Sequence, residues 1–311
     1  MQAALASALL AALAAGPAAA AEAFVTDQPA GQVVVVDLDH MTTAARIEVP
    51  GEPAGIAVSA DGTRAYVTSP EGRFVSVIDT AARRVLRRIA LDGGPLGIAV
   101  APAGRPLYVA DWYAKRLWVL DPEGEAAPAS VAVGTSPSGV AVTPDGRFVL
   151  TADRDDNALS LIDAGSLTRL AVIPVGTRPF GVTIDADGRR AYAANVGSND
   201  VSVVDLAARR VMGTVKVGER PYAVALARGR GFVTNQYGGT VSVFDLETLA
   251  PLAKIEVGDY PEGIAASADG ARVYVANWFS NSLSAIDTEG LKVVGEVTVG
   301  DGPRAFGQFI R

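Results

Sequence analysis

The sequence predicts an all-β protein, a seven-bladed β-propeller of four-stranded antiparallel blades, and three observations support this fold class. Prolines recur at steps of 42 residues, once of 40, at Pro53, Pro95, Pro137, Pro179, Pro221, Pro261 and Pro303. Each proline opens a short apolar run that ends at turn residues, as expected of strands. Other residue types recur in the same register in the seven units. Four short strands within about 40–45 residues are typical of one propeller blade.

Residues 1–21 differ in composition from the rest and are predicted to be a secretory signal peptide. They are rich in alanine, carry no charged side chain and end with Ala19, Ala20 and Ala21 before Glu22, a small-residue cleavage pattern. The usual Lys or Arg near the start is missing, so an uncleaved anchor or a mis-assigned start is the alternative. We expect cleavage to leave residues 22–311 as a propeller in the periplasm or outside the cell.

The first unit of the ring, residues 24–53, begins with a second strand and has no first strand of its own. The C-terminal residues 304–311 carry the missing pattern, because Gly307 falls where other units have a small residue in the first strand. An unpaired sheet edge is unfavourable. We therefore expect this C-terminal strand to join the N-terminal blade and to close the ring.

Residues 54–95 illustrate the four strands of a complete unit. Apolar runs cover residues 55–59, 65–68, 75–78 and 85–91, and Asp61 with Gly62 forms a turn signal between the first two. The same pattern predicts five further blades, at residues 96–137, 138–179, 180–221, 222–261 and 262–303.

Four repeat positions are predicted to be architectural. An aspartate ends each third strand: Asp37, Asp79, Asp121, Asp163, Asp205, Asp245 and Asp287. A large apolar residue lies in each second strand (Phe24, Tyr66, Tyr108, Leu150, Tyr192, Phe232 and Tyr274), and a polar one follows it (Asp27, Ser69, Asp111, Asp153, Asn195, Asn235 and Asn277). One position of the first strand holds a small residue in every unit: Ala57, Ala99, Ala141, Thr183, Ala225, Ala265 and Gly307. These types suit turn hydrogen bonding, packing between sheets and convergence on an axis.

Several segments resemble the YVTN-repeat, YncE-like family of seven-bladed propellers. Residues 65–68 (AYVT), 75–80 (VSVIDT) and 273–277 (VYVAN) carry the resemblance, and related segments extend it over residues 24–311. Members of this family include cell-surface proteins, periplasmic proteins, a DNA binder and the propeller subunits of quinone-cofactor amine dehydrogenases. The resemblance therefore implies the fold and leaves the activity open.

The two faces of the predicted disc differ in their aromatic content. The second-to-third loops and the connections between blades share one face, which we name the connection face. We assign to it Trp112, Tyr113, Phe180, Tyr222, Tyr237, Tyr260, Trp278 and Phe279, whereas the turns of the opposite face contain no aromatic residue. This asymmetry indicates a recognition surface. Closure of the channel and packing within the loops is the alternative interpretation.

Charged residues beside the prolines complete the candidate site. Arg178, Arg220 and Arg304 flank prolines and are expected to surround the channel mouth together with Glu262. Guanidinium groups near aromatic rings stack on them or bind a carboxylate. Acidic residues outnumber basic ones on this face, which favours a cationic partner, and an ordinary solvated surface is the alternative.

The composition excludes several classes of site. The chain has no cysteine, which rules out disulfides and thiolate metal sites, and the single His40 rules out sites with several histidines. The acidic run at residues 153–157 lacks the spacing and the glycine of a calcium loop. The net charge of −7 disfavours nucleic-acid binding. We expect neither a cofactor nor a metal.

These observations predict an exported, monomeric, non-catalytic protein that binds a protein or a small ligand with its connection face. A phosphate-binding loop or a nucleophile elbow is not evident in the sequence. Two catalytic alternatives are a propeller subunit of a quinone-cofactor amine dehydrogenase, with the chemistry in a separate subunit, and a lactonase-type hydrolase. In the hydrolase, Glu262 beside the arginines would act as a base.

Overall fold

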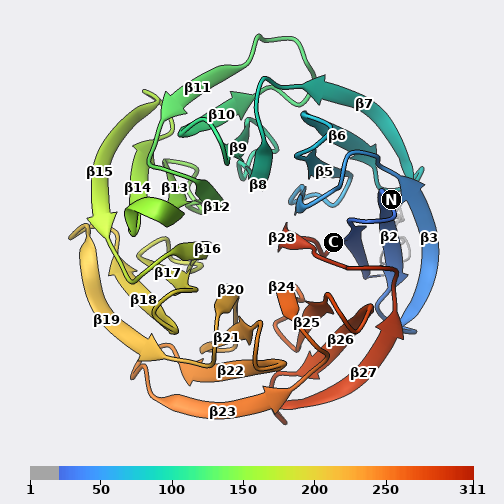
Figure 1. Ribbon diagram of the computed structural model, residues 1–311, viewed down its shortest axis with the longest axis vertical. Helices are drawn as coiled ribbons and strands as arrows, with labels where there is room; N and C mark the ends of the chain where they lie inside the picture. Colours follow the sequence, from blue (N-terminus) through green and yellow to red (C-terminus); the bar gives the residue numbers. More distant parts are fainter. Residues whose placement is uncertain (1–20) are drawn as a thin grey trace, which may run out of the picture.

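The computed structural model describes residues 21–311, whose regular structure is almost entirely short β-strands. These strands form seven sheets arranged in a ring around a central axis (Figure 1). The signal peptide predicted for residues 1–21 lies outside the described residues, except for Ala21. Within residues 21–311 there is no helix long and apolar enough to span a lipid bilayer.

The strands follow one another blade by blade. The first blade contains β1 (Glu22–Asp27), β2 (Gln32–Asp37) and β3 (Thr42–Glu48). The second and third contain β4 (Gly55–Val58), β5 (Arg64–Ser69), β6 (Phe74–Asp79), β7 (Arg84–Ala90), β8 (Pro95–Val100), β9 (Leu107–Asp111), β10 (Arg116–Leu120) and β11 (Ala129–Ala132). The fourth and fifth contain β12 (Pro137–Val142), β13 (Phe148–Asp153), the short helix η1 (Arg154–Asp156), β14 (Ala158–Asp163), β15 (Thr168–Pro174), β16 (Pro179–Ile184), β17 (Arg190–Asn195), β18 (Asp200–Asp205) and β19 (Arg210–Lys216). The sixth and seventh contain β20 (Pro221–Ala227), β21 (Arg230–Asn235), β22 (Thr240–Asp245), β23 (Pro251–Glu256), β24 (Pro261–Ala266), β25 (Arg272–Asn277), β26 (Ser282–Asp287) and β27 (Lys292–Thr298), and β28 (Phe306–Gln308) follows.

The arrangement of these sheets confirms the predicted fold class. Consecutive strands of a blade pair antiparallel, from an inner strand such as β8 to an outer strand such as β11. Figure 1 shows the first strands around the centre and the last strands along the circumference. The middle strands are nearly continuous apolar runs, as in Val33–Val36 of β2, because neighbouring blades cover both of their faces.

The repeated residues have the architectural roles predicted for them. All seven large apolar residues of the second strands are buried. Each third-strand aspartate accepts a hydrogen bond from a backbone N–H of the turn that follows, as Asp79 does from Ala82 at 2.9 Å. These N–H donors lower the pKa of Asp79, Asp121, Asp163 and Asp245 below the usual range. The third-strand aspartates thus stabilise the turns that lead to the fourth strands.

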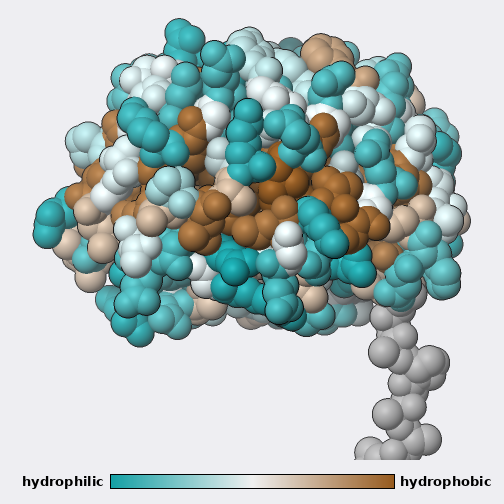
Figure 2. Space-filling view, turned by 90° about the horizontal axis from the view of Figure 1, so that it is seen from below, coloured by the Kyte–Doolittle hydropathy of each residue, from teal (hydrophilic) through white to brown (hydrophobic). Residues whose placement is uncertain are grey.

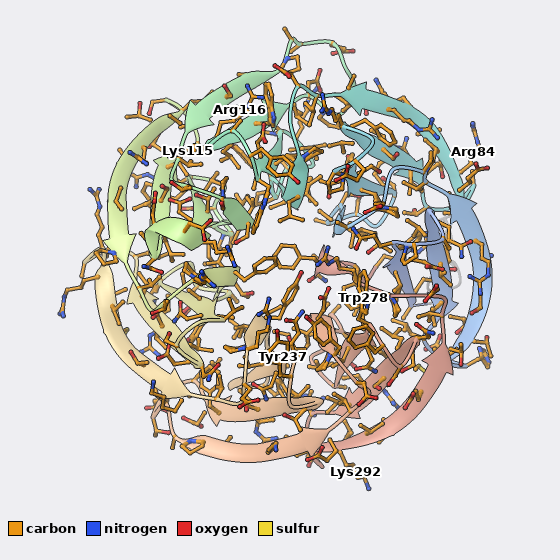
Figure 3. All side chains as sticks on the ribbon, in the orientation of Figure 1. Arg84, Lys115, Arg116, Tyr237, Trp278 and Lys292 are labelled. Atoms are coloured by element: carbon orange, nitrogen blue, oxygen red, sulfur yellow. The ribbon has the colours of Figure 1, made fainter. Side chains whose placement is uncertain are left out.

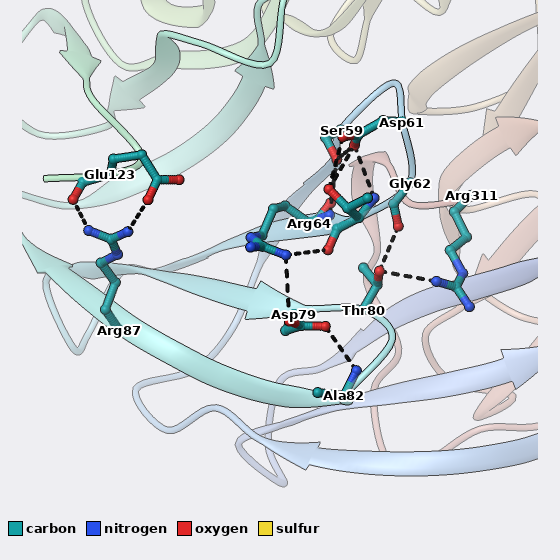
Figure 4. A network of polar contacts seen from close by, with 11 residues as sticks. Ser59, Asp61, Gly62, Arg64, Asp79, Thr80, Ala82, Arg87, Glu123 and Arg311 are labelled. Carbon is teal, nitrogen blue, oxygen red and sulfur yellow. Dashed lines mark hydrogen bonds and ion pairs between the residues drawn. The ribbon is translucent and has the colours of Figure 1, made fainter.

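The C-terminal residues close the ring, as predicted, but they also contact the next blade. Bridges join Asp27 to Pro303 and Ala23 to Ile310, so the tail lies antiparallel beside β1. Between these bridges, β28 pairs parallel with β4 of the second blade. The Arg311 guanidinium donates to the Thr80 hydroxyl at 3.1 Å, which in turn donates to the Gly62 carbonyl (Figure 4). The tail therefore lies beside β1 of the first blade, as predicted, and also joins the second blade.

Part of the outer rim of the ring carries an apolar belt. Figure 2 views this rim from the side and shows the belt between two hydrophilic faces. Leu170, Met212, Leu252 and Val294 are exposed on the outer strands β15, β19, β23 and β27, respectively. They occupy the strand face that has no further strand or blade outside it.

Candidate functional site

Two cavities lie along the propeller axis. One, of about 550 Å³, is lined by the inner strands and includes all seven small residues of the first-strand position, from Ala57 to Gly307. The other, of about 340 Å³, lies at the connection face, and we name it the mouth cavity. Its lining comes from connections between blades and from second-to-third loops, so these segments share one face as predicted.

Aromatic rings separate the two cavities. The ring centroid of Phe180 lies 4.3 Å from that of Tyr222 and 5.0 Å from that of Phe306. All three side chains are buried, and Trp112 extends the group at 6.1 Å from Phe180. Phe306 lines the inner cavity, while Phe180 and Tyr222 line the mouth cavity. These rings therefore close the channel and at the same time form an apolar floor for the mouth cavity.

The residues directly after the repeated prolines converge on this cavity. Around the ring they are Ala54, Leu96, Ser138, Phe180, Tyr222, Glu262 and Arg304, a different residue type in every blade. Leu96, Phe180, Tyr222, Glu262 and Arg304 line the mouth cavity. Because the blades repeat their architectural residues closely, this variable position is not dictated by the blade fold.

A hydrogen-bonded chain of polar side chains crosses one side of the cavity. Arg304 Nε donates to Glu262 Oε2 at 2.8 Å, and Gln236 Nε2 donates to Glu262 Oε1 at 2.6 Å. Arg220 Nε donates to Gln236 Oε1 at 2.7 Å, and Arg304 Nη1 donates to Gln28 Oε1 at 3.2 Å. Glu262 is 2% exposed, so its charge depends on these donors.

The Tyr222 hydroxyl is the buried polar group of this cavity that lacks a hydrogen-bond partner. Burial raises the pKa of Tyr222 well above its usual range, so the phenol keeps its proton. Burial lowers the pKa of nearby Arg304, but the paired Glu262 carboxylate raises it, and the net direction is upward. A neutral hydroxyl donor and a permanent cation thus lie side by side.

A second aromatic group lies beside the mouth cavity. Tyr260 packs against Tyr237 and Phe279, with ring centroids 5.8 and 4.7 Å apart. The outer two rings are largely exposed, and the Arg220 guanidinium lies 4.9 Å from the Tyr237 ring. Trp278 lies 5.3 Å from the Arg304 guanidinium. Tyr237 and Trp278 lie on the half of the ring formed by β20 to β27 (Figure 3).

Backbone geometry at the prolines positions these side chains. The residue before a proline normally avoids helical conformations. Here it adopts a left-handed one in most blades, with φ of 58° at Glu52, 52° at Ser136, 55° at Arg178, 56° at Arg220 and 58° at Tyr260. The amide N–H groups of Arg178 and Arg220 donate to Asn157 and Asn199, respectively, which stabilises this turn. The turn directs the side chain of the residue after the proline toward the propeller axis.

The structure brings most of the predicted site residues together. Trp112, Tyr113, Phe180, Arg220, Tyr222, Tyr260, Glu262 and Arg304 line the mouth cavity, and Tyr237, Trp278 and Phe279 contact members of this set. Arg178 is exposed and does not belong to the lining. Its side chain therefore does not join the ring of charges expected at the channel mouth.

Sequence reasoning missed Gln28 and Gln236, which complete the polar chain. A signal for them existed, because they occupy the same repeat position as Trp112 and Trp278, directly after the polar residue that follows the second strand. Their backbone N–H groups point to the preceding connection, as Gln236 N does to Arg220 O at 3.1 Å.

His40 lies in the turn between β2 and β3, away from the mouth cavity, as expected. Its Nδ1 lies 3.0 Å from Asp37, and this carboxylate raises the pKa of the exposed imidazole. Within residues 21–311, the His, Asp and Glu side chains form no group of three or more that could hold a metal ion.

Comparisons with known proteins agree with the propeller fold. The family model "Lactonase, 7-bladed beta-propeller" matches residues 119–216, a part of the chain. No curated protein matches the sequence significantly. Seven-bladed propeller architecture is therefore supported, without a specific relationship to the YVTN-repeat proteins.

Solved structures show the same fold at low sequence identity. Hydrazine synthase of Kuenenia stuttgartiensis is 21% identical, with a TM-score of 0.74 over 82% of this chain and 89% of that one. A functionally unknown protein from Desulfotomaculum acetoxidans DSM 771 is 16% identical, with a TM-score of 0.78 over 92% and 99%. The dihydro-heme d1 dehydrogenase NirN, in complex with DHE, is 18% identical, with a TM-score of 0.69 over 91% and 74%. At these identities the likeness concerns the fold alone.

Proposed function

We propose that this protein is an exported, non-catalytic propeller of the YVTN-repeat type that binds a small ligand in its mouth cavity. One observation carries the proposal: the position after each proline has a different residue in each blade, and its large and charged members meet at one cavity. Two other blades have a small residue, Ala54 or Ser138, at this position. The fold therefore does not require a buried carboxylate and guanidinium, whose desolvation is costly.

The hydrogen bonds of Glu262 favour binding over hydrolysis. A general base must accept a proton from a water or a substrate. Both carboxylate oxygens of Glu262 already accept hydrogen bonds, one from Arg304 and one from Gln236, and the side chain is buried. We therefore interpret Glu262 as the residue that positions Arg304 and Gln236 and not as a base.

Export rests on the alanine-rich segment that ends at Ala21, just before β1. Expression of the complete chain in a bacterial host, followed by fractionation and mass spectrometry, tests it. A periplasmic protein that begins at Glu22 is the expected result, and an unprocessed chain in the cytoplasm would contradict it.

Ligand binding is tested by a thermal-shift screen of a small-molecule library with the complete protein. We expect at least one compound to raise the melting temperature of the wild type and of Phe279→Ala, because Phe279 lies outside the cavity lining. The same compound should fail with Trp112→Ala, which removes part of the wall. Equal stabilisation of both variants, or no stabilising compound at all, would disprove the assignment of the cavity.

A further inference from the structure

Along the polar chain of the mouth cavity, hydrogen-bond donors outnumber acceptors. Each carboxylate oxygen of Glu262 accepts one hydrogen bond, and Gln236 Oε1 accepts another. A guanidinium has five N–H donors, of which Arg304 uses one on Glu262 and one on Gln28. Arg220 similarly uses one on Gln236 and one on Tyr237. This side of the cavity is therefore left with unused N–H donors and the buried Tyr222 O–H.

The charges on this side of the cavity also favour an anionic ligand, because positive side chains outnumber negative ones here. Glu262 is matched by Arg304 at 2.8 Å. In the part of the chain that the structure describes, no carboxylate lies within 4.0 Å of the Arg220 guanidinium. A buried or half-buried cation without a carboxylate favours an anion from outside. The exposed Glu52 and Glu71 also line the cavity, on the connection and loop next to β4 and β5, and Gln28 lies between Arg304 and the Glu52 carbonyl.

Part of the remaining lining is aromatic and suits a planar body. Trp112, Phe180 and Tyr222 form a continuous row of tilted rings. Aromatic surfaces prefer offset or edge contacts with another ring. A cavity of about 340 Å³ leaves space for one or two fused rings and a small substituent.

We propose that the mouth cavity binds a small aromatic monocarboxylate. This inference rests on the proposed binding function and assigns a chemical class to its ligand. The carboxylate accepts hydrogen bonds from the Tyr222 hydroxyl and from the free N–H groups of Arg304 and Arg220. The ring packs on Trp112 and Phe180. A second carboxylate on the ligand is disfavoured, because it would face Glu52 and Glu71.

Isothermal titration of the complete protein with benzoate, indole-3-acetate, benzamide, benzylamine and phthalate tests the ligand class. We expect the two monocarboxylates to bind at least tenfold more tightly than the amide, the amine or the dicarboxylate. Tyr222→Phe should weaken monocarboxylate binding by about tenfold to a hundredfold, since it removes a hydrogen bond to a charged group and leaves the ring.

Arg178 provides a matched control for Arg220. Both residues precede a proline and have a left-handed backbone conformation, and the amide N–H of each donates to an asparagine side chain. Arg178, however, lies outside the cavity lining. Arg220→Gln should abolish the preference for benzoate over benzamide, and Arg178→Gln should preserve it. Thermal melting of each variant confirms that it is folded.

Three outcomes would overturn this assignment. They are tighter binding of benzylamine than of benzoate, equal effects of Arg178→Gln and Arg220→Gln, or no binding of any probe. If the library screen still finds a ligand that requires Trp112, the proposed binding function stands and only the ligand class is wrong.

Discussion

Asp153 occupies a repeat position that three other blades fill with asparagine. In those blades, Asn195, Asn235 and Asn277 donate through Nδ2 to a serine seven residues later. Asp153 instead accepts hydrogen bonds from Thr151 at 2.7 Å and from Ser160 at 2.5 Å, and its side chain has no cationic partner. Burial raises the pKa of Asp153 to about 6. The folded protein therefore disfavours the charged form of the Asp153 carboxyl group.

Replacing Asp153 by Asn should stabilise the protein at neutral pH. The folded-state pKa is above the unfolded value, so wild-type stability from this group is present below about pH 4 and is lost as the pH rises through 6. A shift of about two units corresponds to roughly 2–3 kcal/mol. The melting temperature of Asp153→Asn minus that of the wild type should increase between pH 4 and pH 7.

Asp245→Asn is the control for this experiment, because backbone N–H donors lower the pKa of Asp245. This variant should lose stability at pH 7. If the difference between Asp153→Asn and wild type does not change between pH 4 and pH 7, the folded protein does not hold Asp153 in a raised-pKa state.

At the scale of residues, the sequence predicted architecture better than it predicted the site. Each repeated position could be interpreted from one blade, since the partners of Asp79 or Tyr66 lie in the same or a neighbouring sheet. The polar chain joins Arg220, Gln236, Glu262 and Arg304 from different blades. Side-chain conformations decide which of these residues meet, and periodicity does not contain that information.

The inner strands show why small residues are needed at the axis. A glycine or alanine follows the variable residue in each inner strand, at positions 55, 97, 139, 181, 223, 263 and 305. A Cβ atom on Gly97 would lie 1.8 Å from the carbonyl oxygen of Ser138 in the next blade. The close approach of β8 and β12 therefore depends on this glycine. The sequence shows that these positions are small in every unit, but only the packed ring shows which backbone atom they approach.

Gly97→Ala should destabilise the propeller because the clash is with backbone and cannot be relieved by a side-chain rotation. Overpacking of this kind costs about 1–3 kcal/mol or more. Urea unfolding should show a lower midpoint than for the wild type. Gly165→Ala is the matched control, since its Cβ would lie 3.5 Å from Asp163 and its φ is not positive. Equal midpoints for the two variants would contradict the proposed close packing.

At the scale of the whole molecule, ring closure joins residues almost the full length of the chain apart. Phe24 N donates to Phe309 O at 2.8 Å, and Arg304 N donates to Thr26 O at 2.9 Å. The missing first strand of the first unit was enough to predict this closure. The parallel pairing of β28 with β4 was not predictable, because it arises from the bend of the tail across two blades.

A chain that ends at Pro303 should be insoluble or should melt far below the full-length protein. Truncation exposes the edge of β1 and removes Phe306, Phe309 and Ile310, which are all buried. Loss of a large buried side chain costs about 2–5 kcal/mol. In the full-length chain, Phe309→Ala should lower the melting temperature clearly, whereas Gln308→Ala, at an exposed neighbour, should not. A truncated chain that melts with the full-length protein would show that the ring closes without its C-terminal strand.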